Sequence, residues 1–122
     1  MGNPVNHFEI IGRDGAKLQK FYGDLFGWKI DANNPMNYGM VEAAEGGIAG
    51  GIAAGDPQSP EAAGPRVTFY VQVADPAATL KKAESMGGKT VMQPMDVPGG
   101  PTIAQFADPD GNVIGLTKAG SM

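Results

Sequence analysis

The strongest constraint on the fold of this chain is an internal repeat. Shifting the 122-residue sequence by 61 residues, half its length, superposes two segments without a gap. The matched positions form an alternating strand and both ends of a helix; they are Phe8 with Phe69, Ile10 with Val71, Asp14 with Asp75, Leu25 with Met86 and Gly27 with Gly88. The closing segments match at a shift of 64 residues, with Gly51 on Gly115 and Ile52 on Leu116. The chain is therefore predicted to contain two copies of one strand-helix-strand-strand-strand unit.

The first half of the chain shows the patterns of that unit. Residues 5–11 alternate as a strand, in which His7 and Glu9 share one face. Asp14 is expected to cap a helix, which ends at Gly27 because glycine accepts the left-handed backbone of a helix C-terminus. Three short strands are expected to follow, at residues 28–31, 38–43 and 48–53.

The same order begins again after a polar, Pro-rich linker at residues 54–65. Residues 66–73 alternate as a strand. Asp75 is expected to cap the next helix, with Pro76 at its first position, and the helix is expected to end at Gly87 or Gly88. The remaining strands are expected at residues 89–93, 102–107 and 112–118.

The segment FADPDGNVIGL contains a tight turn before the last of these strands. Pro109 presets φ for the turn, and Gly111 or Asn112 can adopt a positive φ. Asp108 can accept backbone N–H groups inside the turn. Asp108 and Asp110 are therefore read as turn-forming residues.

The composition excludes several classes of function. The chain has no cysteine, which rules out disulfides, thiolate metal sites and cysteine nucleophiles. The net charge is −4 and the basic residues are dispersed, so no nucleic-acid partner is expected. No apolar run approaches the ~20 residues of a membrane span, and the N-terminus lacks the pattern of a signal peptide. A cytoplasmic location without membrane partners is the default expectation.

Four segments carry a resemblance to a known family: HFEII, KLQKFYGDLFGWKI, FYVQVADPAATLKKAESMGGKTV and FADPDGNVIGL. They resemble the vicinal oxygen chelate superfamily, which includes glyoxalase I, bleomycin-resistance proteins and extradiol dioxygenases. The resemblance implies an α+β fold within a single glyoxalase-like domain, residues 1–122. Its two tandem βαβββ modules, residues 5–53 and 66–118, would have mixed sheets that form a cup-shaped pair of half-barrels with the helices outside. A shared fold does not by itself identify a reaction.

In metal-using members of the superfamily, four strand positions direct ligands into the cup. The resemblance transfers these positions to His7, Gly51, Thr68 and Gly115, and only His7 has a ligand-type side chain. Many relatives read DPDGN-x-x-E-L where this chain reads DPDGNVIGL. A divalent metal site generally needs three or four protein donors. The usual metal site is therefore predicted to be absent, and no cofactor is expected.

A reduced metal site is the alternative. Glu9 lies two residues from His7 on the same strand face, so the two side chains emerge roughly 6.5–7 Å apart. Gln105 or Glu42 could supply a third donor to such a site.

The side chains that remain in the cup predict a small-molecule site, because such pockets combine apolar walls with a few convergent polar groups. His7 and Glu9 are the candidate catalytic residues, for proton transfer. The candidate ligand-binding residues are Arg66, Thr68, Tyr70, Gln72, Met40, Gly51 and Gly115, with the glycines expected to leave empty space. Further apolar walls could come from Met92, Met95, Trp28 and Tyr38. Arg66 suits an anionic ligand, and a structural ion pair with Glu9 is its ordinary alternative.

Three functions stay open from the sequence. The first is a protein that binds a small organic molecule without a metal; an anionic molecule is one form of this hypothesis. The second is a lyase, isomerase or dioxygenase-type enzyme that uses His7 and Glu9. The third is a structural or regulatory dimer with a vestigial cup. A homodimer is expected in each case, since exposed sheet edges need cover.

Overall fold

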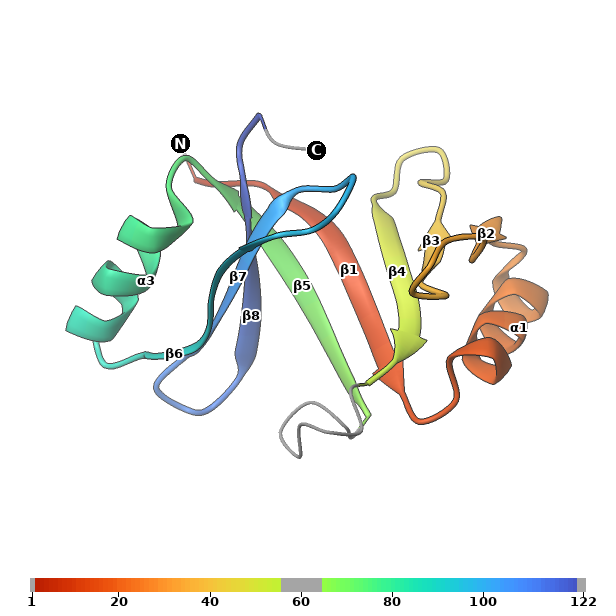
Figure 1. The fold of residues 1–122 in the computed structure, drawn as a ribbon, viewed down its shortest axis with the longest axis horizontal. Helices are drawn as coiled ribbons and strands as arrows, with labels where there is room; N and C mark the ends of the chain where they lie inside the picture. The colour runs from red at the N-terminus through yellow and green to blue at the C-terminus, as the bar shows by residue number, and fades with distance from the viewer. Residues whose placement is uncertain (1, 56–64, 121–122) are drawn as a thin grey trace. The chain divides into compact units, whose positions relative to one another are not determined.

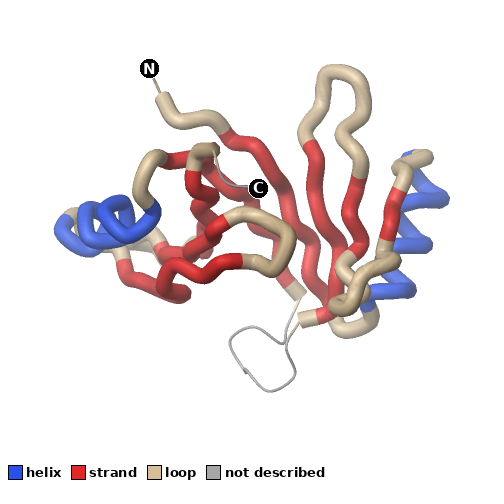
Figure 2. Tube along the Cα trace, turned by 45° about the horizontal axis from the view of Figure 1, so that its top comes forward, coloured by secondary structure: helices blue, strands red, loops and turns tan. Residues whose placement is uncertain are grey.

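The computed structural model describes residues 2–55 and 65–120. Its elements run strand, helix and three strands, twice over (Figures 1 and 2). This order confirms the predicted α+β class and its repeated βαβββ unit. The chain divides into two compact units: residues 7–67, and residues 68–122 together with the N-terminal segment that ends at Asn6. Most of the predicted linker, residues 56–64, lies outside the described residues.

In the unit of residues 7–67, the strands are hydrogen-bonded in the order β2-β3-β4-β1. β1 is parallel to β4, and the other two pairs are antiparallel. The elements are β1 (Val5–Gly12), α1 (Gly15–Phe26), β2 (Ile30–Asp31), β3 (Gly39–Val41) and β4 (Ala49–Ala54).

The sequence signals at both ends of α1 are confirmed. The Asp14 side chain accepts a hydrogen bond from the Lys17 N–H at 3.1 Å, which caps the N-terminus. Gly27 ends the helix with φ of 69°, and its N–H donates to the Gly23 carbonyl at 2.9 Å.

α1 contacts β4 and β3 and packs on one face of this sheet. In Figure 1 it lies at the right, next to β2 and β3. The Gln19 amide donates to the carbonyl of Ile52, a fully buried residue, at 2.8 Å. On the same face the Phe8 ring lies against Gly50 and 5.3 Å from the Trp28 ring. Because side chains alternate along a strand, the neighbours of Phe8 on β1 point to the opposite face.

In the second unit, the order is β5-β8-β7-β6, with β5 parallel to β8. The N-terminal segment joins this unit, because the Gln72 N–H donates to the Pro4 carbonyl at 2.9 Å and the Asn6 amide donates to Thr117 Oγ1 at 3.1 Å. The elements are β5 (Arg66–Val73), α3 (Pro76–Ser85), β6 (Lys89–Asp96), β7 (Thr102–Ala107) and β8 (Val113–Lys118).

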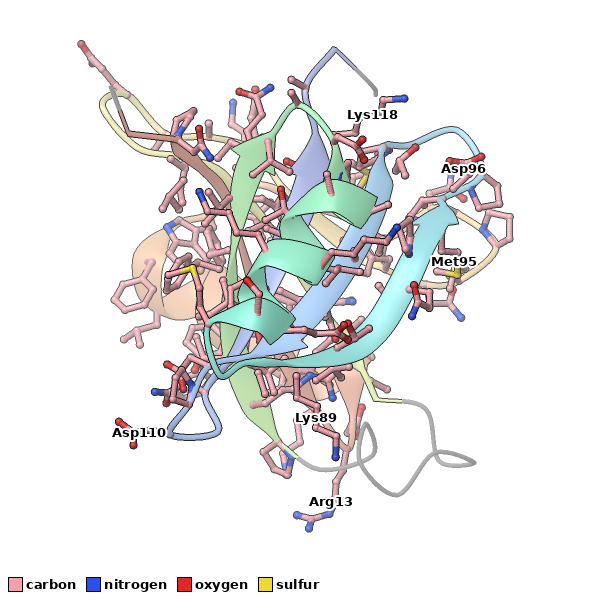
Figure 3. All side chains as sticks on the ribbon, turned by 90° about the vertical axis from the view of Figure 1, so that its left-hand side faces the viewer. Arg13, Lys89, Met95, Asp96, Asp110 and Lys118 are labelled. Atoms are coloured by element: carbon pink, nitrogen blue, oxygen red, sulfur yellow. The ribbon has the colours of Figure 1, made fainter. Side chains whose placement is uncertain are left out.

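α3 covers one face of this sheet, as Figure 3 shows from its solvent side. The same view labels Lys89 and Asp96 at the two ends of β6. Asp75 caps the helix by accepting from the Ala78 N–H at 3.2 Å. A buried apolar cluster joins α3 to the sheet; its members are Leu80 of α3 and the strand residues Val73, Ala104 and Leu116.

The DPDGN turn has the predicted structure. Asp108 Oδ1 accepts from the N–H groups of Asp110 and Asn112, both at 2.9 Å, and Gly111 has φ of 94°. Hydrogen bonding from the Asn112 side chain, followed by its backbone N–H, holds the pKa of Asp108 below its ordinary value. Asp108 and Asp110 therefore shape this turn.

Several predicted element boundaries differ from the structure. α3 ends at Ser85 with Met86 as its C-cap, and Gly87, where the end was expected, follows with a positive φ of 99°. Trp28 precedes β2, because its ring packs on Phe8, Tyr22 and Phe26 instead of extending a strand. Tyr38 precedes β3 and lies in a loop. β6 continues beyond the predicted residue 93 to Asp96, with irregular register that keeps it paired to β7.

Candidate functional site

His7 and Glu9 lie on the face of β1 opposite to the one that carries Phe8. In the register of the sheet, Glu9 is the neighbour of Gly51 on β4, and Gly51 is the neighbour of Met40 on β3. Glu9 is 9% exposed and His7 is half-buried, whereas Met40, in the middle of β3, is 58% exposed. The two predicted catalytic residues therefore share a face with two predicted ligand-binding positions.

A residue that was predicted only as an apolar wall connects His7 to Glu9. The Tyr38 hydroxyl donates to Glu9 Oε2 at 3.0 Å and lies 3.1 Å from His7 Nε2. A phenol has a single hydrogen to donate, so His7 is the donor in the second bond and carries its proton on Nε2. The two rings are nearly parallel, with centroids 6.5 Å apart and 15° between their planes. His7, Tyr38 and Glu9 thus form one hydrogen-bonded chain.

The Tyr38 ring occupies the space that was expected to be empty beside Gly51. A Cβ atom on Gly51 would collide with the Tyr38 hydroxyl and the ring carbons next to it. The expectation of a vacant ligand position is therefore wrong at this glycine, because an aromatic ring from the loop before β3 fills it.

The loop that presents Tyr38 is held by its asparagines. Asn34 makes two bonds to the Tyr38 backbone: its amide donates to the carbonyl at 2.8 Å, and its side-chain oxygen accepts from the N–H at 2.9 Å. Asn37 adopts a positive φ of 51°, which asparagine tolerates better than most residues. Gln19 of α1 donates to the Asn37 carbonyl at 3.1 Å. The sequence signal was present in DANNPMNYG, a run of turn-forming residues.

Burial determines the protonation state of His7 in this hydrogen-bonded chain. Desolvation lowers the pKa of His7 below its ordinary value, and the nearby Glu9 carboxylate, which acts to raise it, only partly offsets that effect. The imidazole is therefore neutral at pH 7, which agrees with its role as a one-proton donor to Tyr38.

The second unit repeats the arrangement with different residues. Tyr70 on β5 is the neighbour of Gly115 on β8. Gly115 is in turn the neighbour of Gln105 on β7, and Gln105 pairs with Met92 on β6. A Cβ atom on Gly115 would collide with the Tyr70 ring. The Gln105 amide donates to the Tyr70 hydroxyl at 3.0 Å. The space predicted at Gly115 is therefore also filled by a tyrosine.

The other predicted ligand-binding residues lie along β5. Thr68 is 3% exposed, and its hydroxyl has no hydrogen-bond partner among the described residues. Arg66 at the strand start and Gln72 near its end are half-buried. Of the remaining predicted wall residues, Met95 on β6 is 50% exposed and is labelled in Figure 3. The structure groups these residues by unit, and their convergence with His7 and Glu9 in one cup stays a prediction.

The donor set of the described residues does not fit the divalent metal that the fold family implies. No three His, Cys, Asp or Glu side chains of residues 2–55 and 65–120 come together as a metal-binding group. His7 and Glu9 are both hydrogen-bonded to Tyr38. Of the predicted third donors, Glu42 is exposed, and Gln105 donates to Tyr70.

Comparison with known proteins identifies the family. The family model of the Glyoxalase/Bleomycin resistance protein/Dioxygenase superfamily matches residues 5–116. The chain belongs to this superfamily. The predicted resemblance is thereby confirmed, and the two βαβββ units carry its fold.

Proteins similar to this chain include the anthracycline biosynthesis protein DauV of Streptomyces sp. (strain C5), which is 28% identical over 94% of this chain. The chain spans only 46% of the length of that protein. A glyoxylase-like domain-containing protein of Didymella fabae is 31% identical, with 88% of both chains covered.

Solved structures agree on the fold. Methylmalonyl-CoA epimerase from Mycobacterium tuberculosis has a TM-score of 0.66 and 18% identity, with 93% of this chain and 86% of that chain covered. The hypothetical protein BH1468 from Bacillus halodurans C-125 has a TM-score of 0.70 and 14% identity, with 100% and 98% covered. Within the part of the chain that the structure describes, no helix is long and apolar enough to span a membrane.

Proposed function

We propose that this chain is a glyoxalase-superfamily protein that binds a small organic molecule without the divalent metal used by other members. One observation carries the proposal: a tyrosine ring covers the glycine at both last-strand positions, Gly51 and Gly115. A ligand side chain at either position would require the tyrosine to leave. The polar groups on the same faces, such as the buried Thr68 hydroxyl, are suited to orienting a ligand.

The similarity to anthracycline biosynthesis proteins and the fold shared with methylmalonyl-CoA epimerase support two starting classes of ligand. Arg66 would favour an anionic group on the ligand. A cytoplasmic location and a homodimer are part of the same proposal, and sedimentation velocity would measure the assembly.

Isothermal titration calorimetry on chelator-treated protein tests this function. The panel should contain an anthracycline, methylmalonyl-CoA and small aromatic metabolites, with the products analysed after each titration. The expected result is saturable binding of at least one compound, recovered unchanged. Turnover of the bound compound, or binding that appears only after a metal is added, would contradict the proposal.

The hydrogen-bonded chain favours a second candidate function, an isomerase or lyase that moves protons. In such a reaction the Glu9 carboxylate would take a proton from a carbon next to a carbonyl and return it to the substrate. The neutral His7 would hold the Tyr38 phenol in place during the transfer. Proton exchange into deuterated solvent, followed by NMR with methylmalonyl-CoA as the probe, would detect this activity. Glu9→Gln should abolish the exchange, and an unchanged rate in Glu9→Gln and His7→Ala would remove this candidate.

A further inference from the structure

Tyr38 makes, inside its own chain, the contacts that a bound phenol would make. We propose that His7, Glu9 and the backbone of Gly51 form a subsite for an aromatic hydroxyl group, which Tyr38 occupies in the free protein and which a phenolic ligand takes over. The inference rests on the proposed small-molecule function and names the class of ligand for this part of the site.

The hydrogen bonds of Tyr38 define the polar end of the subsite. A phenol can donate one hydrogen bond and accept another through the same oxygen. Glu9 Oε2 accepts a hydrogen bond from the Tyr38 hydroxyl at 3.0 Å. His7 Nε2 donates to the same hydroxyl oxygen, at 3.1 Å. The subsite therefore offers an acceptor and a donor to one oxygen atom.

The β4 backbone at Gly51 forms the surface beneath the Tyr38 ring. Only glycine at position 51 lets an aromatic ring approach the β4 backbone, because a Cβ atom there would collide with it. Glycine in a strand interior weakens the strand and often marks a close approach of a ligand or another backbone. β4 carries two adjacent glycines, Gly50 and Gly51, each covered by an aromatic ring. The Phe8 ring packs on Gly50 on the face that carries α1. Gly51 is therefore the glycine that lets a ring pack on the opposite face.

The charges of His7 and Glu9 favour a neutral hydroxyl group as the occupant of the subsite. A neutral imidazole and a carboxylate complement a neutral hydroxyl group, whereas a ligand carboxylate or phosphate would face the charge of Glu9 at close range. A hydrocarbon ring could not donate the hydrogen bond that Glu9 Oε2 accepts from a phenol, and losing a hydrogen bond to a charged group is costly. The subsite therefore selects phenols over both anions and plain arenes, although Arg66 alone would favour an anion.

The position of Tyr38 makes exchange feasible. Tyr38 precedes β3, so its side chain can rotate away without breaking the pairing of β3 with β4, which begins at Gly39. The two bonds from Asn34 are made to the Tyr38 backbone, so rotation of the side chain does not break them. The ring is half-buried, so it can turn out toward solvent.

The most direct experiment removes the Tyr38 ring from the subsite by mutation. The Tyr38→Ala variant should bind phenol saturably, seen as a rise in melting temperature with phenol concentration and as a shift of the NMR signal of His7, the only histidine in the chain. Toluene, which has the same ring without the hydroxyl, should bind about tenfold more weakly or worse, because the hydrogen bonds to charged and polar partners are lost. Equal binding of phenol and toluene would overturn the inference.

Two variants serve as controls. Tyr38→Phe keeps a ring over Gly51, so phenol should produce no comparable shift. Tyr38→Ala combined with Glu9→Gln removes the carboxylate acceptor and should lose most of the preference for phenol over toluene. Retention of the full preference in the double variant would contradict the assigned role of Glu9.

An experiment on the wild-type protein tests the phenol subsite even if Tyr38→Ala fails to fold. Calorimetry with 1-naphthol, naphthalene and 1-naphthoate should rank 1-naphthol first, and equal affinities or a preference for 1-naphthoate would overturn the inference. Phenol binding to Tyr38→Ala without binding of any panel compound to the wild type would support the subsite and overturn the proposed function. The two failures are therefore distinguishable.

Discussion

At the scale of single residues, the site is a coupled chain of His7, Tyr38 and Glu9. The alternation of β1 predicted that His7 and Glu9 share a face, and the structure confirms it. Their connection through Tyr38 could not be predicted, because it depends on how Asn34 and Asn37 fold the preceding loop. Strand periodicity carries no information about a side chain that enters the sheet face from a loop.

Replacing Glu9 should change the titration of His7. The carboxylate is the influence that raises the His7 pKa against burial, so in Glu9→Gln the pKa should fall further below its ordinary value. Proton NMR of the single histidine ring measures this directly. An unchanged or raised pKa would contradict the observed proximity of the two groups.

His7 should also make stability depend on pH. Its pKa is lower in the folded state than in the unfolded chain, so between the two values the unfolded chain binds more protons. The His7 contribution is therefore complete above about pH 6.5 and declines as the pH falls toward the folded pKa. Urea titrations at pH 7.5, 6.5 and 5.5 should show a smaller decline in His7→Asn than in the wild type. Identical pH profiles for the two proteins would refute this linkage.

Adding a methyl group at Gly51 should destabilise the protein through Tyr38. Gly51→Ala places a Cβ atom against the ring, and overpacking of this kind costs about 1–3 kcal/mol. In the Tyr38→Ala background the same change should cost much less. A double-mutant cycle by urea denaturation measures the coupling, and additive effects would show that the two residues do not compete for one space.

At the scale of elements, the sequence predicted the helix ends better than the loops. Aspartate caps and glycine stops act over a few residues of local backbone, so Asp14, Asp75 and Gly27 could be assigned from sequence alone. The strand expected at residues 28–31 begins with Trp28, but the ring of Trp28 packs on Phe8 and its backbone lies outside β2. Tertiary packing overrode local preference there.

The cap of α3 provides a test at this scale. Asp75→Ala removes the acceptor for the Ala78 N–H and should lower the free energy of unfolding by about 1 kcal/mol. Asp75→Ser, which keeps a capping oxygen, should restore most of the loss. Thermal and urea denaturation would measure both variants, and equal stability of Asp75→Ala and the wild type would contradict the observed cap.

At the scale of the whole molecule, the repeat explains both the fold and the altered site. Each unit places a tyrosine over the glycine of its last strand, yet the two tyrosines come from different places in the repeat. Tyr70 stands at the position equivalent to Glu9, whereas Tyr38 enters from the loop before β3. The missing ligand side chains at Gly51 and Gly115 were visible in the sequence, but what fills their place depends on side-chain packing within each sheet.

The most direct measurement is a calorimetric titration of 1-naphthol into the wild-type protein before and after exhaustive chelation, with the metal content determined in both samples. The account predicts saturable binding of the same affinity in both samples and no stoichiometric metal in either. Binding that disappears on chelation and returns with one equivalent of a divalent metal would contradict it.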